Sequence, residues 1–488
     1  MVRFPSTIPR DEEGYLGPIL FNPGAVEGIQ MVLGRAALFR TILGEGYDLI
    51  GFDPRGLGFT TPTLTTMISP GEEGLFYNKL SLLVNSSDTA LGALYASSHV
   101  VGAFAKARVG DVAQHVGTPV VARDMLSITK AHGRDKLQYW GFSYGSVLGA
   151  TFAAMFPENV GRLIIDGVVD SPDYYKALWS RNLMDTDAEL FQLYQACVDA
   201  GPLVCAIHES STEKIHSRVQ GLLTKIRSYP ASFYNATTGV YGEVDYSLVK
   251  SVILSVLYKP HDLGKGLVSA IADLEQGNPE PIWQLSGGKE AGKLLTGSCA
   301  CPATPEKPWN KIGRENFYAI ACGDGDVVTD SVDALRKYYD DLAEDSIFAE
   351  NWYIRVGCAG WKVRAKERFT ASFETNTSYP ILLIGNTADP VTPLANAKKM
   401  SKGFKNSVVL TQESAGHCSI SATSLCTAKA IRAYFRNGTL PQEGAVCDVQ
   451  SSIFDDKLSL AGNALSVQDW ELLQASRGLQ QSYFVPII

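Results

Sequence analysis

The pattern Gly-x-Ser-x-Gly at residues 141–145 constrains this chain more than any other feature of its sequence. It stands between an apolar stretch with strand-forming aromatics, residues 137–142, and a helical stretch of small and apolar residues, 144–150. The backbone at Ser143 must therefore turn sharply, and the two flanking glycines avoid side-chain clashes at that turn. The turn exposes the Ser143 hydroxyl at the positive end of the following helix, which predicts a nucleophilic serine.

Further apolar runs alternate with helical stretches on both sides of this turn. Each run stops at a turn rich in Gly, Asp, Asn or Pro, as buried parallel strands do. The rhythm predicts an α/β fold with a mostly parallel sheet and helices on both of its faces. The expected strands lie at residues 18–21, 47–52, 162–168, 379–386 and 407–411.

The rhythm breaks after about residue 171, and a chain of 488 residues is too long for one compact core. The intervening segment is composed of helical and loop-forming stretches, which predicts a large, mainly helical cap inserted into the sheet domain. We therefore expect an N-terminal core part over residues 1–170, the cap over 171–345, a C-terminal core part over 346–450 and a tail over 451–488.

Two further residues complete a catalytic hypothesis with Ser143. Asp389 and His417 each follow a predicted buried strand, and the chain order Ser, Asp, His is the one that a nucleophile elbow of this kind requires. His417 would accept the serine proton, and Asp389 would orient the imidazole and stabilise its charged form. Asp166 also follows a strand and is a less favoured alternative to Asp389.

Main-chain amides near Ser143 are candidates for the oxyanion hole. The amide of Tyr144 follows the nucleophile, and the turn at Gly24–Ala25 follows the first predicted strand. Asp53 and Arg55 end the next strand, and we expect them to pair and to shape the mouth of the pocket.

Composition excludes several classes of function. The formal net charge is −8 with no basic cluster, which argues against nucleic acid and against an anionic membrane surface. The sequence predicts no cofactor and no metal site, because Cys299-x-Cys301 lacks a second ligand pair at zinc spacing. The oligomeric state stays open. We interpret the six remaining histidines as surface or structural residues: His99, His115, His132, His208, His216 and His261.

The cellular compartment stays open as well. Nine cysteines and four glycosylation sequons, which would make the chain a glycoprotein, suggest a secretory ancestry. Residues 1–7 lack the apolar core of a signal peptide, so the sequence as written predicts an intracellular protein. The disulfide pairing cannot be derived from spacing. The sequons begin at Asn85, Asn235, Asn376 and Asn437.

Taken together, the motifs resemble the tripeptidyl-aminopeptidase and prolyl-aminopeptidase branch of the α/β-hydrolases, in particular its fungal, TAP-like members. The resemblance spans about residues 18–450 and implies Ser143, Asp389 and His417 as the triad beneath a substrate-selecting cap. It implies removal of short peptides or prolyl residues from a free amino terminus. The matching stretches are residues 21–24, 51–56, 141–145, 162–168, 319–324, 385–393, 416–417 and 434–441, with Cys447 beyond them.

Two departures from that family pattern concern the region before the elbow. Ala25, Val26 and Glu27 replace much of the expected glycine-rich oxyanion turn, and Glu27 would place a carboxylate near a developing negative charge. Only about 17 residues precede the first predicted strand, where the family has two more strands, so one sheet edge would be bare or covered in another way.

The sequence thus predicts a cofactor-independent serine hydrolase acting on a small-molecule or short-peptide substrate. In an aminopeptidase-like enzyme, the acidic cap residues Asp185, Asp187 and Glu189 could hold a substrate ammonium, although such charge runs are usually solvated. The alternative is an intracellular hydrolase or cyclase of fungal secondary metabolism, acting on an ester, lactone or thioester. A second alternative is a non-catalytic binding protein on a hydrolase fold.

Overall fold

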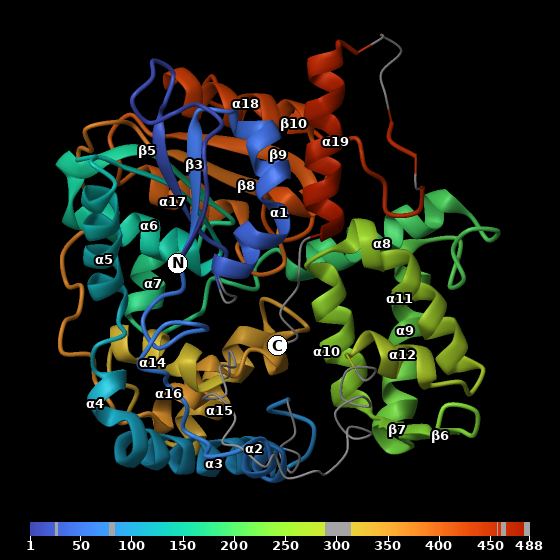
Figure 1. The fold of residues 1–488 in the computed structure, drawn as a ribbon. Coiled ribbons are helices and arrows are strands. Elements are labelled where there is room, and N and C mark those ends of the chain that lie inside the picture. The colour runs from blue at the N-terminus through green and yellow to red at the C-terminus, as the bar shows by residue number, and fades with distance from the viewer. Residues whose placement is uncertain (25–27, 78–82, 288–313, 456, 460–464, 483–488) are drawn as a thin grey trace.

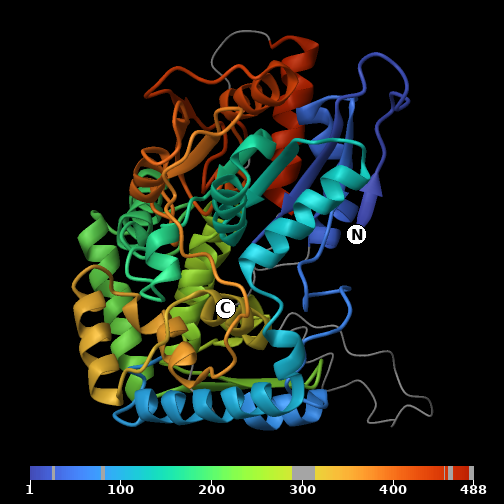
Figure 2. The same ribbon diagram turned by 90° about the vertical axis from the view of Figure 1, so that its left-hand side faces the viewer.

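A twisted central sheet lies above two helical lobes (Figures 1 and 2). This computed structural model describes the chain except for residues 25–27, 78–82, 288–313, 456, 460–464 and 483–488. None of the described helices is both long and apolar enough to span a bilayer.

The described part of the main sheet has the strand order β1-β3-β2-β4-β5-β8-β9-β10. All neighbouring strands are parallel except β1, which runs antiparallel to β3 and covers that edge. Strand β1 was not predicted, because its three residues carry no alternation long enough to indicate a strand. The strands are β1 Val2–Phe4, β2 Gly17–Asn22, β3 Tyr47–Gly51, β4 Leu137–Phe142, β5 Val160–Asp166, β8 Leu382–Ala388, β9 Val408–Ala415 and β10 Val446–Asp448.

Alternating side chains of the sheet enter two separate apolar cores, one on each face. Phe21 and Trp140 pack with α1, α18 and α19, whereas Leu20 and Tyr139 pack with α5, α6 and α17. The stretch expected only as a tail therefore supplies α19 to one face of the sheet. These helices are α1 Gly28–Leu43, α5 Thr118–Ala131, α6 Tyr144–Met155, α17 Leu394–Ser401, α18 Leu425–Asn437 and α19 Val467–Ser482.

One lobe below the sheet is built from α8 to α12 around its own apolar core. A disulfide between Cys197 and Cys205 lies within it, and the β6–β7 hairpin adds a small antiparallel sheet that the sequence did not predict. The elements are α8 Thr186–Ala200, α9 Thr212–Ser228, β6 Ala231–Asn235, β7 Val240–Val244, α10 Tyr246–Leu257, α11 Pro260–Glu275 and α12 Glu280–Leu285.

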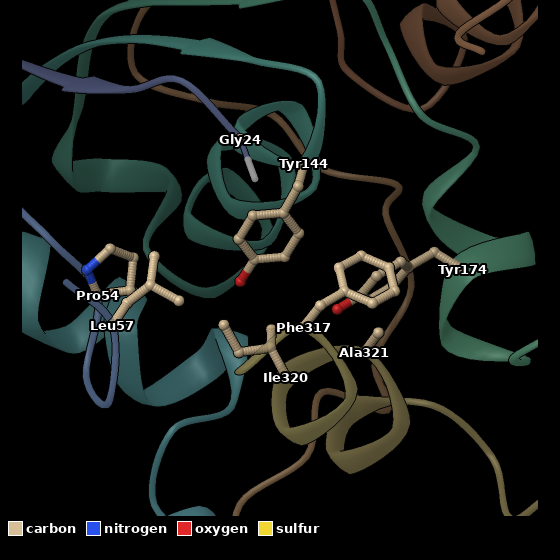
Figure 3. Close-up of a pocket in the computed structure, with 8 residues that line it drawn as sticks. All are labelled: Gly24, Pro54, Leu57, Tyr144, Tyr174, Phe317, Ile320 and Ala321. Carbon is tan, nitrogen blue, oxygen red and sulfur yellow. The ribbon is translucent and has the colours of Figure 1, made fainter. Parts of the chain in front are cut away.

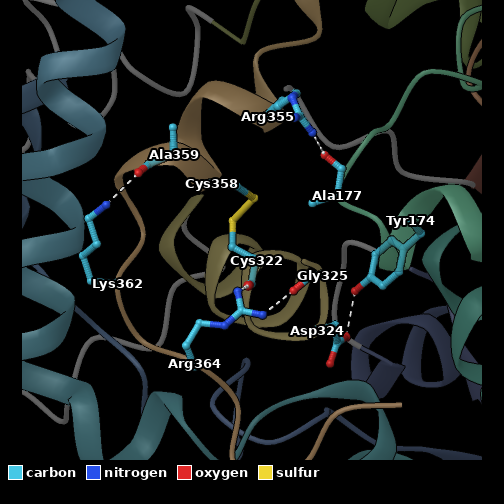
Figure 4. The surroundings of a disulfide bond; sticks show 10 residues. All are labelled: Tyr174, Ala177, Cys322, Asp324, Gly325, Arg355, Cys358, Ala359, Lys362 and Arg364. Atoms are coloured by element: carbon cyan, nitrogen blue, oxygen red, sulfur yellow. Dashed lines mark hydrogen bonds between the residues drawn. A yellow bond between two sulfur atoms is a disulfide. The ribbon is translucent and has the colours of Figure 1, made fainter. Parts of the chain in front are cut away.

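The other lobe combines helices from before and after the elbow. Helix α3 packs along α16, and the disulfide Cys322–Cys358 joins α14 to α16 (Figure 4). Residues 60–116 gave only weak sequence signals, yet they supply α2 to α4 of this lobe. Its helices are α2 Pro70–Tyr77, α3 Ala90–Phe104, α4 Gly110–Ala113, α7 Ser171–Tyr175, α14 Arg314–Asp324, α15 Val332–Ala343 and α16 Ile354–Gly360.

The chain leaves the main sheet after β5 and rejoins it at β8, so the whole excursion spans residues 167–381. The boundary at residue 345, placed from the sequence, stays a prediction. Gly117 is the N-cap of α5, and the Thr118 side chain bonds to Asp324.

The crossing of α3 and α16 gives a prediction on stability. A Cβ on Gly102 would lie 1.9 Å from the Gly360 carbonyl oxygen, whereas a Cβ on Gly92 of the same helix meets nothing within 4 Å. We expect Gly102→Ala to destabilise the protein by about 1–3 kcal/mol through overpacking. Gly92→Ala should instead stabilise it by up to about 1 kcal/mol through helix propensity. Denaturant unfolding measures both, and equal effects would contradict the crossing.

Candidate active site

Ser143 occupies the strained turn that the sequence predicted. Its φ is 57° and its ψ is −121°, between the end of β4 and the start of α6. A Cβ on Gly141 would lie 2.4 Å from the Gly145 carbonyl oxygen, and one on Gly145 would lie 2.5 Å from the Asn22 carbonyl oxygen. Both positions therefore require glycine, because main chain rather than a flexible side chain fills the space.

His417 and Asp389 form a buried pair at the ends of β9 and β8. His417 Nδ1 lies 3.0 Å from each carboxylate oxygen of Asp389, and Thr392 Oγ1 lies 3.1 Å from the same nitrogen. Asp389 also accepts hydrogen bonds from the Thr392 and Cys418 amides. Burial alone would raise the pKa of Asp389, but the His417 ring and these donors lower it below its usual value.

Asp166, the alternative acid, serves a different part of the site. It accepts hydrogen bonds from the amide and the hydroxyl of Ser419, at 2.8 and 2.5 Å, and from Trp140 Nε1 at 3.3 Å. Burial raises its pKa to about 6, although these donors oppose the shift. The carboxylate that contacts His417 is therefore Asp389.

Among the described residues, no hydrogen bond joins Ser143 to His417. The side chain that approaches His417 Nε2 is Cys418, whose Sγ lies 3.5 Å from this nitrogen. Catalytic hydrogen bonds are often formed fully only with substrate bound. The structure thus brings Asp389 and His417 together at the ends of β8 and β9, and it places Ser143 at the end of β4, with β5 between β4 and β8.

The structure describes two of the predicted oxyanion donors. The Tyr144 amide is free to donate to an oxyanion, whereas the Gly24 amide already donates to a side chain. Tyr144 opens α6, so its N–H has no acceptor within the helix. The Gly24 turn lies against the nucleophile, since a Cβ there would be 2.9 Å from Ser143 Cβ, but the Gly24 N–H donates to Asn22 Oδ1. Ala25 and Glu27 lie outside the described residues, so a donor from Ala25 stays a prediction.

The expected ion pair between Asp53 and Arg55 is absent. Arg55 pairs instead with Asp124 of α5, with Nε 2.7 Å from Oδ2. Asp53 is buried and accepts the amides of Ile29 and Phe59 at 3.0 Å each. Asp53 therefore joins the segments after β2 and β3 by accepting hydrogen bonds from their main-chain amides. The short spacing between Asp53 and Arg55 in the sequence gave no indication of these distant partners.

An apolar pocket, partly open to solvent, adjoins the elbow (Figure 3). Tyr144 and Gly24 line its upper side, and α14 contributes its floor. None of the described residues that line it is charged. The lining residues are Gly24, Pro54, Leu57, Tyr144, Tyr174, Phe317, Ile320 and Ala321.

Asp324 holds the tyrosines of this pocket in place. The fully buried carboxylate accepts the Tyr174 hydroxyl at 2.8 Å (Figure 4). It also accepts both the amide and the hydroxyl of Thr118, whose oxygen lies 2.6 Å from the Tyr144 hydroxyl. Burial raises its pKa to about 6 against these hydrogen bonds. Sequence reasoning assigned Asp324 no role, although it lay within a stretch that carried the family resemblance.

The acidic residues at the start of α8 differ from one another. Asp187 bonds to Ser346 Oγ at 2.7 Å and to the Ile347 amide. Glu189 is fully buried, and neither carboxylate oxygen has a hydrogen-bond partner among the described residues. Burial and the charge of Asp389 raise the pKa of Glu189 well above its usual value. A solvated acidic face, the usual interpretation of such a run, is therefore wrong for Glu189.

Other candidate residues take no part in this site. Cys426 and Cys447 form a third disulfide, so Cys418 is the free cysteine of the described residues, whereas Cys299 and Cys301 lie outside them. His261 is buried, with Nε2 3.4 Å from Ser414 Oγ, and burial lowers its pKa to about 4.

Comparisons with known proteins match this architecture. The family described as the alpha/beta hydrolase fold matches residues 17–217, and the family described as TAP-like protein matches residues 345–447. Together with the parallel sheet and the elbow, they define the chain as an α/β-hydrolase.

Two relatives cleave peptides by name, and one of them is named a serine protease. Serine protease Hip1 of Mycobacterium tuberculosis is 26% identical over 92% of this chain and 83% of its own length. Tripeptidyl aminopeptidase of Streptomyces lividans is 25% identical over 88% of this chain and 76% of its own length. A monoacylglycerol lipase structure from Paleococcus ferrophilus aligns with 90% of this chain and 98% of its own at 12% identity and a TM-score of 0.34, and the fold assignment does not depend on it.

The chain is thus a serine hydrolase of the α/β-hydrolase type, with homology to these two enzymes. Hydrolase relatives imply a small-molecule or peptide substrate. Fungal origin, a place in secondary metabolism and glycosylation stay predictions.

The two buried carboxylates allow a matched test of the acid. We expect Asp389→Asn to lower kcat by about 10⁴-fold, because an amide cannot hold the required imidazole tautomer. Asp166→Asn should cost far less, since Asp166 contacts the Ser419 turn rather than the imidazole. Steady-state hydrolysis of an aryl ester by both folded variants measures this, and a larger loss in the Asp166 variant would reverse the assignment.

Proposed function

We propose that Ser143, His417 and Asp389 hydrolyse a peptide bond through an acyl-enzyme. His417 Nε2 accepts the Ser143 proton as Oγ attacks the carbonyl carbon, and the Tyr144 amide donates to the developing oxyanion. His417 then protonates the departing amine, and the same imidazole activates the water that cleaves the acyl-enzyme. The observation that carries this proposal is the buried Asp389–His417 pair at the same edge of the sheet as the elbow, where Ser143 is held at positive φ.

The nucleophile can be tested directly by fluorophosphonate labelling of the purified full chain. We expect one adduct, mapped by peptide mass spectrometry to Ser143, because only a serine beside a general base reacts at a useful rate. Ser143→Ala should remove the adduct, and His417→Ala should slow labelling severely. A folded protein without an adduct would refute an activated Ser143 and support the binding-protein alternative.

We further propose that the substrate carries a free amino group, received by Glu189. An unpartnered, fully buried carboxyl is costly in a folded protein, and a substrate ammonium would supply both a counter-charge and hydrogen-bond donors. Helix α8 brings Glu189 to the catalytic end of the sheet, because Thr186 Oγ1 donates to the Pro390 carbonyl directly after Asp389. The homology to tripeptidyl aminopeptidase supports the same class of substrate.

Glu189→Gln should slow the hydrolysis of substrates that carry a free amino group and have little effect on uncharged substrates. We expect kcat/KM for a tripeptide anilide with a free amino group to fall about 10- to 100-fold, the usual worth of a charged hydrogen bond. Hydrolysis of an aryl acetate should change little, since it lacks the ammonium.

Asp187→Asn is the matched control, because this residue lies on the same helix but bonds to Ser346. It should affect stability and leave the ratio of the two activities unchanged. An unchanged ratio in the Glu189 variant would contradict ammonium recognition.

Ester hydrolysis is a second candidate, favoured by the pocket beside Gly24 and Tyr144. Its lining is apolar and uncharged, which suits an acyl chain or aromatic ester as well as an apolar peptide side chain. Comparing N-acetylated and free peptides with aryl esters on the wild-type protein distinguishes the two functions.

A further inference from the structure

The side chains of His417 and Cys418 present two metal-binding atoms to each other. His417 Nε2 and Cys418 Sγ lie 3.5 Å apart, and both residues are buried. Tetrahedral zinc, with Zn–N near 2.05 Å and Zn–S near 2.3 Å, places its nitrogen and sulfur ligands about 3.6 Å apart. The spacing in the protein therefore already equals that of a zinc-bound pair.

The surroundings of His417 match those of a zinc-bound histidine. Such a histidine donates its second ring N–H to a carboxylate, which orients the ring and makes the other nitrogen more basic. Asp389 occupies this position, 3.0 Å from Nδ1. Asp389, His417 and Cys418 offer ligand atoms that all lie within 4.8 Å of one another.

The backbone holds the thiol in this position. Cys418 has a φ of 63°, rare for a residue with a side chain, and its amide donates to Asp389 Oδ2 at 2.9 Å. A Cβ on Gly167 would lie 2.4 Å from Cys418 Sγ, so the thiol fits only because that residue is glycine. The positive φ of Cys418 and the glycine at position 167 thus hold the thiol between the Asp166 carbonyl oxygen and His417 Nε2, each 3.5 Å from Sγ.

We propose that His417 Nε2 and Cys418 Sγ bind a zinc-class divalent ion that inhibits the hydrolase. The thiol proton is released to solvent as the metal–sulfur bond forms, and no electron is transferred. In this proposal, water molecules supply the remaining ligands of the ion. The bound ion occupies the nitrogen lone pair that must accept the Ser143 proton, so hydrolysis stops while it is bound.

Cadmium provides a test that does not depend on activity, because a cadmium–thiolate bond gives a charge-transfer absorption band. We expect one cadmium ion per chain to produce this band in the wild-type protein and in the control Cys299→Ser/Cys301→Ser, which lacks the cysteines outside the described residues. Cys418→Ala should lack the band. His417→Ala should need more than about tenfold more cadmium, because one of two side-chain ligands is gone.

Zinc should slow fluorophosphonate labelling of Ser143 in the wild-type protein. In Cys418→Ala, and in Cys418→Ser if the alanine variant does not fold, the inhibition constant for zinc should rise at least about tenfold. A cadmium band that persists without Cys418, a band lost with Cys299 and Cys301, or equal zinc inhibition in wild type and variant would overturn the proposal. The band tests metal binding even if Ser143 proves unreactive.

Discussion

The carboxylate of Asp389 is the buried charge on which the catalytic end of the sheet depends. A buried carboxylate is tolerated only when fixed donors replace the water it has lost. Asp389 obtains them from the Val391 and Thr392 amides of its own loop and from the ring and the following amide of the His417 loop. One side chain thereby joins the ends of β8 and β9 and sets the direction of the imidazole.

A second buried carboxylate supports the same loop from the other side. Asp166, at the end of β5, accepts from both the amide and the hydroxyl of Ser419, two residues after His417. The two acids differ in their environment, because His417 lowers the pKa of Asp389 while burial dominates at Asp166. A difference of this kind allows one carboxylate to stay ionised beside the imidazole while the other acts as a structural acceptor.

Local sequence signals predicted the strands of the main sheet except β1 and β10, and they carried the catalytic hypothesis, because both depend on short-range rules. A buried strand followed by a turn places its last residues at one edge of a parallel sheet, so the positions of Asp389 and His417 alone predicted that they would meet. The nucleophile turn was predictable for the same reason, since the glycines around Ser143 serve local backbone geometry.

Contacts between distant segments could not be predicted in this way. Arg55 forms its ion pair with Asp124 on α5 rather than with Asp53, which is only two residues away in the sequence. Helix α3 packs on α16 through main-chain contact at Gly102. Glu189 looked like part of a solvated charge run because burial is a property of the assembled cap. Asp324 likewise gained its role only when α14 brought it to Thr118 and Tyr174. Neither periodicity nor composition encodes these pairings.

The cap and the catalytic loop are not independent parts. Thr186 and Asn182 donate to the carbonyls of Pro390 and Val391, the two residues that follow Asp389. A displacement of α8 large enough to admit substrate from that side would break these bonds and disturb the donors around the acid. Substrate entry is therefore expected elsewhere, and entry through the partly open apolar pocket lined by Leu57 and α14 would leave the Asp389 loop intact.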